Sequence, residues 1–141
     1  MNFRNRMVNV LMLSGKKVKA EKILNESLDI IEKKYNKDPD KLFIKAIQQT
    51  CPSFEMRSIR IAGRTQQIPV PSKESKQVGL AMKWLTQSAR LSNRKSMAES
   101  LAQVLYETCN GKGEAIKKRN ELHKLVEANR AFTHYLSLIH I

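Results

Sequence analysis

The sequence is poor in aromatic residues, in cysteine and in long apolar runs. Only 6% of its 141 residues are aromatic, which argues against a surface that binds RNA by stacking many bases. No apolar run approaches the roughly 20 residues that cross a bilayer, so a transmembrane protein is excluded. Cys51 and Cys109 lie far apart and match no metal-ligand spacing. We expect them to be buried thiols rather than a disulfide.

Acidic residues are also scarce. The chain has 13 Asp and Glu against 26 Lys and Arg, which gives a net charge of +13 and a pI near 10.0. A small protein tolerates so much like charge mainly when a polyanion neutralises it. The excess is spread over the first 120 residues rather than held in a tail, which predicts a folded basic face that binds nucleic acid. The alternative is a solvated basic surface with no defined partner; a membrane surface is less favoured, because the apolar stripes are needed for the core.

The spacing of apolar residues and helix breakers predicts one domain over residues 1–141 that is mainly α. We expect about six helices, at residues 2–13, 16–36, 38–51, 72–91, 96–109 and from 113 to beyond 131. Asp38 and Ser72 are the expected N-caps of the third and fourth helices. Between these two helices, residues 54–70 predict a protruding two-stranded β-hairpin whose turn contains Gly63. The fold class is therefore a helical bundle with one hairpin.

The predicted hairpin carries Arg57, Arg60 and Arg64 with few acidic neighbours. An isolated two-stranded ribbon is marginally stable in water, so something must hold it. We expect a contact arm that RNA holds. The alternative is a hairpin folded flat on the helices, with its arginines solvated.

The motifs of catalysis are missing. The chain has neither a GxxxxGK[ST] phosphate-binding loop nor a GxGxxG fingerprint. All three histidines lie in the last 19 residues, and His123 and His134 are too far apart for one metal ion. Trp84 is interpreted as a core residue rather than a base-stacking one. We predict a protein that is not an enzyme, with no catalytic residue, no cofactor, no metal site and no small-molecule substrate.

Four segments resemble, in order and near-constant spacing, the small-subunit ribosomal protein S-seven family of bacterial or organellar type. Residues 7–17 (MVNVLMLSGKK) are similar to the family's first helix and its lysine turn, and residues 57–70 (RSIRIAGRTQQIPV) to its β-ribbon. Residues 79–84 and 95–98 are similar to its fourth helix and the start of its fifth. The most specific block is GKGEAIKKRNELHKLVEANRAFTHY, at residues 111–135. The resemblance covers roughly residues 3–135.

The resemblance implies a protein that binds the 3′ major (head) domain of small-subunit rRNA and nucleates assembly of that domain. It also implies a position beside the exit-site tRNA and the mRNA exit channel, next to ribosomal protein S-eleven. Basic residues at matching positions are expected to neutralise phosphates, while specificity comes from the shape of the folded RNA. These rRNA-binding residues are Lys16, Lys17, Arg57, Arg60, Arg64, Lys83, Arg90, Lys95, Lys117, Lys118, Arg119, His123 and Arg130. The competing hypotheses are a DNA-binding regulator or nucleoid protein and, less favoured, an RNA-modifying enzyme.

The chain also departs from the family. It starts almost at the first helix instead of with a basic arm, it has Ala62-Gly63 where the family has Gly-Gly, and an acid dilutes the basic run at residues 72–76. Residues 136–141 form an apolar extension that either docks on a neighbouring protein or packs on the core. Weaker RNA anchoring, together with 17 Lys against 9 Arg as in AT-rich genomes, predicts a mitochondrial ribosome. A bacterial cytoplasmic or a plastid ribosome is the alternative.

Overall fold

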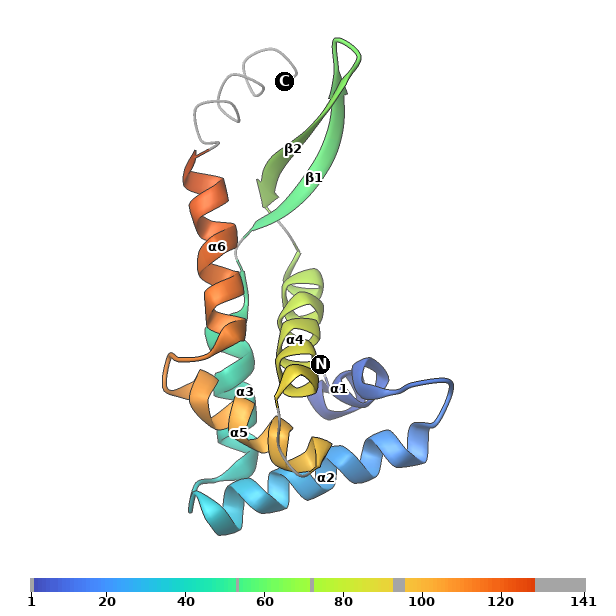
Figure 1. Cartoon of the computed structure of the whole chain (residues 1–141), viewed down its shortest axis with the longest axis vertical. Helices are drawn as coiled ribbons and strands as arrows, with labels where there is room; N and C mark the ends of the chain where they lie inside the picture. Colours follow the sequence, from blue (N-terminus) through green and yellow to red (C-terminus); the bar gives the residue numbers. More distant parts are fainter. Residues whose placement is uncertain (1, 53, 72, 93–95, 129–141) are drawn as a thin grey trace.

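The computed structural model describes residues 2–52, 54–71, 73–92 and 96–128. Within these ranges the chain forms six α-helices and one two-stranded sheet (Figure 1). The elements are α1 (Phe3–Leu11), α2 (Lys17–Lys34), α3 (Pro39–Thr50), β1 (Phe54–Ile61), β2 (Arg64–Pro71), α4 (Glu74–Leu91), α5 (Met97–Cys109) and α6 (Glu114–Ala128). The predicted fold class, a mainly α bundle with a hairpin between the third and fourth helices, is confirmed. The expected C-terminal end of the last helix, beyond residue 131, and the extension at residues 136–141 lie outside the described residues.

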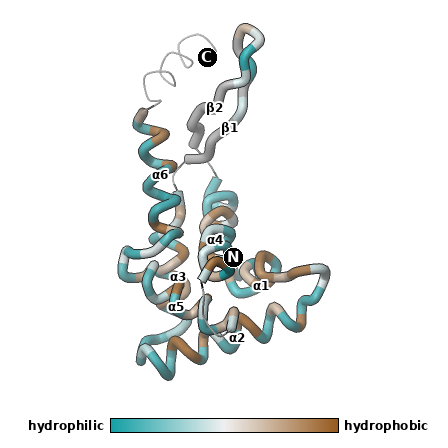
Figure 2. Tube along the Cα trace, in the orientation of Figure 1, coloured by the Kyte–Doolittle hydropathy of each residue, from teal (hydrophilic) through white to brown (hydrophobic). Residues whose placement is uncertain are grey.

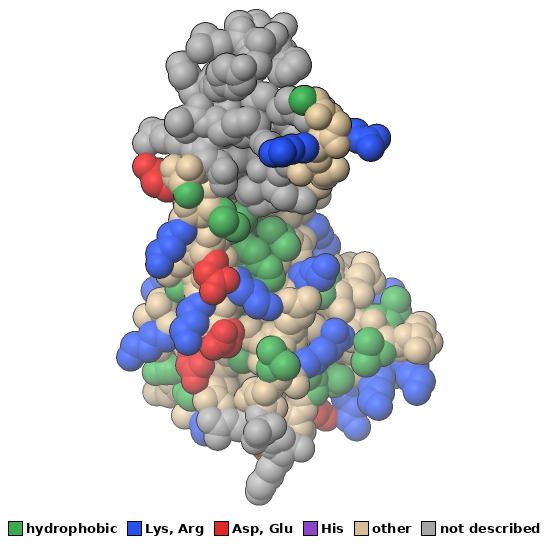
Figure 3. Space-filling model, turned by 45° about the horizontal axis from the view of Figure 1, so that its top comes forward, with side chains coloured by type: hydrophobic (Ala, Val, Ile, Leu, Met, Phe, Trp, Pro, Cys, Tyr) green, Lys and Arg blue, Asp and Glu red, His purple; other side chains and the backbone are tan. Residues whose placement is uncertain are grey.

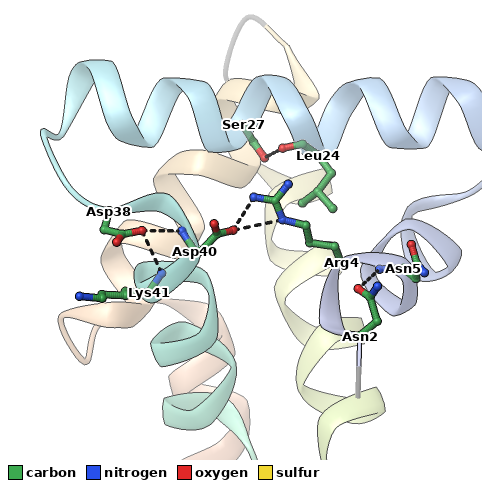
Figure 4. A network of polar contacts seen from close by, with 8 residues as sticks. All are labelled: Asn2, Arg4, Asn5, Leu24, Ser27, Asp38, Asp40 and Lys41. Atoms are coloured by element: carbon green, nitrogen blue, oxygen red, sulfur yellow. Dashed lines mark hydrogen bonds and ion pairs between the residues drawn. The ribbon is translucent and has the colours of Figure 1, made fainter.

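Local chemistry explains where the helices begin. Asp38 caps α3 as predicted: its carboxylate accepts hydrogen bonds from the backbone N–H of Asp40 at 3.1 Å and of Lys41 at 3.4 Å (Figure 4). Ser96 caps α5 in the same way, through the N–H of Glu99 at 3.2 Å. At α4 the N-cap position is Lys73, which makes no side-chain capping bond; Ser72, the expected cap, lies outside the described residues.

The core lies where α5 packs against α2, α3 and α4. The largest fully buried side chains come from all of the first five helices: Met7, Leu24, Ile31, Phe43, Ile47, Met82, Leu85, Leu101 and Leu105. Each contributes roughly 1.5–3 kcal/mol by leaving water. By contrast, α6 buries only Ala115 and Ile116, and Figure 2 shows it as largely hydrophilic. Five helices therefore form the body, and α6 is attached to it mainly by its first turn.

Two polar contacts fix α1 on the body. The guanidinium of Arg4 forms an ion pair with Asp40 in the first turn of α3 (Figure 4). Arg6 donates to the backbone oxygen of Ser75 in α4 at 2.9 Å. A Cβ on Gly79 would lie 3.0 Å from the same guanidinium, so the absence of a side chain there gives Arg6 its place.

The hairpin turns over two residues, Ala62 and Gly63. Its strands pair from Ile61 with Arg64 to Phe54 with Pro71, so the hairpin ends one residue after the predicted residue 70. Both turn residues have positive φ, 50° at Ala62 and 78° at Gly63, as in the primed turns that match strand twist. Figure 1 shows the hairpin projecting beyond the helices, with contacts from its strands to α6. The protruding arrangement, rather than the flat one, is present.

Other expectations concern single residues. Cys51 and Cys109 are free thiols as predicted, but both are half-buried rather than buried. Trp84 is partly buried against the core, as predicted.

In the described ranges, no helix combines the length and the apolar character needed to cross a membrane. Nor is any group of three or more His, Cys, Asp and Glu in these ranges arranged to hold a metal ion.

Candidate nucleic-acid interface

The turn between α1 and α2 exposes a compact basic site. Ser14 and Gly15 reverse the chain with φ of 53° and 76°, and Lys16 and Lys17 follow directly, both exposed. The N-terminus of α2 has no side-chain cap and no acidic residue in its first turn. The helix dipole adds positive potential to that of the two lysines. This end of α2 is therefore suited to a phosphate group.

The hairpin presents cations on both of its faces. Arg60 and Arg64 are both exposed. Arg60 pairs with Thr65, whereas Arg64 pairs with Ile61. Because neighbouring positions on a strand point to opposite faces, the two arginines lie on opposite sides of the ribbon. The ribbon can therefore bind phosphates that pass on either side of it. The backbone of Arg57 lies within β1, opposite Ile68.

Helix α4 carries a row of exposed basic residues on the side away from the core. Lys83 and Arg90 are exposed and seven residues apart, which places them on one face, about 10 Å apart along the axis. Lys76, exposed and seven residues before Lys83, lies on the same face and was missed by the sequence prediction. Its signal was the repeated spacing of seven. The row runs toward the hairpin from the body.

The three adjacent cations of α6 have different surroundings. Lys117 is exposed and forms an ion pair with Glu114 in the previous turn at 3.3 Å. Lys118 is half-buried and donates to the side-chain oxygen of Gln87 in α4 at 2.8 Å.

Arg119, also half-buried, donates to the backbone oxygen of Gln49 in the last turn of α3 and to the side-chain oxygen of Asn120 at 3.1 Å. Of the three, Lys117 is the most accessible to RNA. His123 is exposed further along α6, whereas Lys95 and Arg130 lie outside the described residues.

The predicted residues do not converge on a cleft. Those within the described ranges extend from the α1–α2 turn at the side of the helical body, over α4, to the projecting hairpin (Figure 1). In Figure 3, Lys and Arg side chains are seen on the hairpin, over the middle of the molecule and at its lower right. An extended array of exposed cations binds a phosphate backbone rather than a small molecule.

The surroundings of Cys51 change the pKa of its thiol. Burial, and in second place the Glu74 carboxylate, raises the pKa of the Cys51 thiol above its ordinary value. The thiol is therefore more fully protonated at neutral pH than a solvated cysteine, which makes it a poor nucleophile.

Comparisons with known proteins find a matching family model and similar proteins. A family model described as ribosomal protein S7p/S5e matches residues 2–130. The small ribosomal subunit proteins uS7 of Leptothrix cholodnii and Methylibium petroleiphilum are each 44% identical to the chain over 131 residues, which is 93% of this chain and 84% of each relative. That of Polynucleobacter necessarius is 45% identical over 130 residues, 92% of this chain and 83% of the relative.

Proposed function

The chain belongs to the ribosomal protein S7p/S5e family, a structural and non-enzymatic ribosomal component, and from this membership we propose that it binds the 3′ major (head) domain of small-subunit rRNA. The observation that carries the proposal is the basic α1–α2 turn, where Lys16 and Lys17 stand at the uncapped N-terminus of α2. The helix dipole and the two cations together form a site for one RNA phosphate. The row on α4 and the hairpin arginines extend the contact.

The arrangement suits a protein that organises a folded RNA. Its cations on α2 and α4 lie on a body held rigid by one core, so RNA segments bound to these helices are held at fixed distances from one another. Phosphate contacts set position and register, while the shape of the RNA junction supplies specificity. This is how we propose that the protein nucleates assembly of the head. The projecting hairpin is the element that we propose to lie near the exit-site tRNA, the mRNA exit channel and ribosomal protein S-eleven.

The test is a competition between two nucleic acids. The purified chain is titrated into a transcript of the head domain and into duplex DNA of equal length, at several salt concentrations. We expect much tighter binding to the folded RNA, and a loss of affinity when Lys16 and Lys17 are both changed to Ala. Equal affinity for RNA and DNA would instead favour a DNA-binding regulator.

The relatives in the comparisons come from bacteria. They fit the alternative location, a bacterial ribosome, and lend no support to a mitochondrial one, which rests on the departures from the family pattern and on amino-acid composition. The mitochondrial location stays a prediction that fractionation of the source cells tests. Co-sedimentation with small subunits from purified mitochondria supports it, and recovery with bacterial or plastid ribosomes contradicts it.

A further inference from the structure

Three hollows in the described part of the chain lie along α5. The largest, about 810 Å³, lies between α2 and α5. Two others, of about 570 and 190 Å³, continue from it along α5 toward the start of α6. Gln103 lines all three, so they form one surface. We call this surface the α5 face; it surrounds Gln103 and is bounded by Glu26, Glu99, Tyr35 and Glu107.

The charge of the α5 face is opposite to that of the whole chain. Five acidic residues, Glu26, Asp29, Glu99, Glu107 and Glu114, line its hollows, against three lysines. In the whole chain basic residues outnumber acidic ones by 26 to 13. An RNA backbone is repelled by such a surface, whereas a cationic ligand is attracted.

Aromatic rings add a second feature for a cationic ligand. The rings of Tyr35 and Tyr106 lie with their centroids 4.1 Å apart and line the hollows. The ammonium of Lys34 already lies 5.6 Å from the centre of the Tyr35 ring. Leu91, 75% exposed, borders the smallest hollow. Aromatic faces bind guanidinium and ammonium groups, and apolar rims bind the methylene stems that carry them.

Two buried hydroxyl groups that line the smallest hollow have no hydrogen-bond partner among the described residues. Ser88 and Thr108 line the smallest hollow and are only 6% and 1% exposed. Neither hydroxyl makes a hydrogen bond within the part of the chain that the structure describes. Because a buried polar group without a partner costs about 1–3 kcal/mol, these hydroxyls favour a polar ligand that reaches into the hollow.

We propose that the α5 face binds a Lys- and Arg-rich polypeptide segment of a neighbouring protein. A metal ion is a poorer fit, because no set of three metal-ligating side chains converges in the described ranges. That the partner is a neighbour in the small subunit rests on the proposed function: a protein that also binds rRNA carries the same excess of cations. The preference of the face for a cationic peptide depends only on its own residues.

The test uses the full-length chain and a short fluorescent peptide rich in Arg and Leu. Binding is followed by fluorescence anisotropy for the wild type and for a variant with Glu99→Gln and Glu107→Gln. Glutamine at position 107 keeps an oxygen that can accept the 2.8 Å hydrogen bond from Gln103. We expect roughly threefold to tenfold weaker binding, because two exposed ion pairs are lost.

The matched control changes Glu21 and Glu121 to Gln. Both are exposed, lie outside the hollows described above and alter the net charge by the same amount. We expect the control to bind the peptide like the wild type. Equal weakening in both variants, or weakening in neither, overturns the proposal, because the peptide then senses only the overall charge or does not bind at this face.

Titration of the same proteins with the head-domain transcript separates this proposal from the proposed function. We expect the variant with Glu99→Gln and Glu107→Gln to bind RNA like the wild type, since the α5 face makes no RNA contact. An RNA affinity that changes only in the Glu99 and Glu107 variant shows that RNA occupies the face and overturns the proposal. Failure of the wild type to bind the transcript contradicts the rRNA function and leaves the peptide result to be judged by itself.

Discussion

Residues that are neighbours in the sequence of α6 have different tasks in the fold. Successive side chains on a helix are about 100° apart, so Lys117, Lys118 and Arg119 point in three directions. Lys117 remains exposed, whereas Lys118 reaches α4 through Gln87. Arg119 donates to a carbonyl in the last turn of α3, where a helix leaves oxygens without partners. Part of the predicted RNA-binding block therefore also holds α6 in place.

The first prediction separates these roles. Arg119→Ala removes a charge-assisted hydrogen bond that is partly buried, so we expect the free energy of unfolding to fall by about 1.5–3 kcal/mol in urea denaturation. Lys117→Ala removes one exposed ion pair, so its effect should stay below about 0.5 kcal/mol. It should instead lower the salt slope of RNA binding by about 0.7–0.9. Equal losses of stability in the two variants contradict the division of roles.

The second prediction concerns Cys51. Its raised pKa leaves less thiolate at a given pH, so alkylation by iodoacetamide near pH 8 should be slower in the folded protein than in the unfolded chain. Glu74→Gln removes one of the two causes, which lowers the pKa and should speed the reaction at that pH. The rate of modification of Cys51 is read by peptide mass spectrometry, with the unfolded chain as control. A rate that Glu74→Gln leaves unchanged shows that the carboxylate has no influence.

Among the elements, the hairpin has the least support from the core, and its turn carries a local cost. Ala62 has a φ of 50°, a left-handed conformation that disfavours residues with a Cβ by about 1–2 kcal/mol. Gly63 takes a similar conformation without that cost. The hairpin forms nevertheless, because its strands pair over eight residues each and contact α6.

The third prediction follows from this turn. Ala62→Asn places a residue that tolerates positive φ at the first turn position, so the hairpin should gain about 0.5–1 kcal/mol. Hydrogen exchange of the paired amides of Ile61 and Arg64 is the measurement, because it reports on the hairpin separately from the body. Ala62→Val is the opposing control and should speed exchange. If the asparagine variant exchanges faster than wild type, the turn conformation is not the limiting factor.

The fourth prediction treats the hairpin as a binding arm. Replacing Arg60 and Arg64 by Ala should lower the salt slope of RNA binding by about 1.4–1.8 if each contacts one phosphate. Thermal unfolding should hardly change, since both side chains are exposed. Lys33 and Lys34, which line the α5 face, provide the matched control, because their replacement removes the same charge away from the proposed RNA surface. An unchanged slope in the arginine variant means that the ribbon faces solvent or protein.

How much of the whole molecule can be predicted depends on how far apart in the sequence the interacting residues lie. The helices could be predicted to within about three residues, because apolar periodicity and capping residues such as Asp38 are local signals. The hairpin was predictable from the glycine in its turn. The bond from Arg119 to Gln49 joins residues 70 positions apart, and no local pattern encodes it. The α5 face was missed for the same reason, since Glu26 and Glu99 meet only once α2 packs on α5.

The last prediction concerns the net charge of +13, which is a property of the whole chain. The ion pairs Arg4–Asp40, Lys22–Glu26 and Lys117–Glu114 are exposed, so they contribute little to stability. Repulsion among the excess cations opposes the compact state. Raising NaCl from low concentration to about 0.15 M shortens the Debye length to about 8 Å and screens that repulsion. We therefore expect Tm to rise by roughly 2–5 °C, which corresponds to about 1 kcal/mol for a chain of this size.

Calorimetry in NaCl is the measurement, because sulfate would also strengthen apolar burial. The variant with Glu21 and Glu121 changed to Gln is more positive and should show a larger rise, whereas a Tm that falls with salt means that ion pairs outweigh the repulsion.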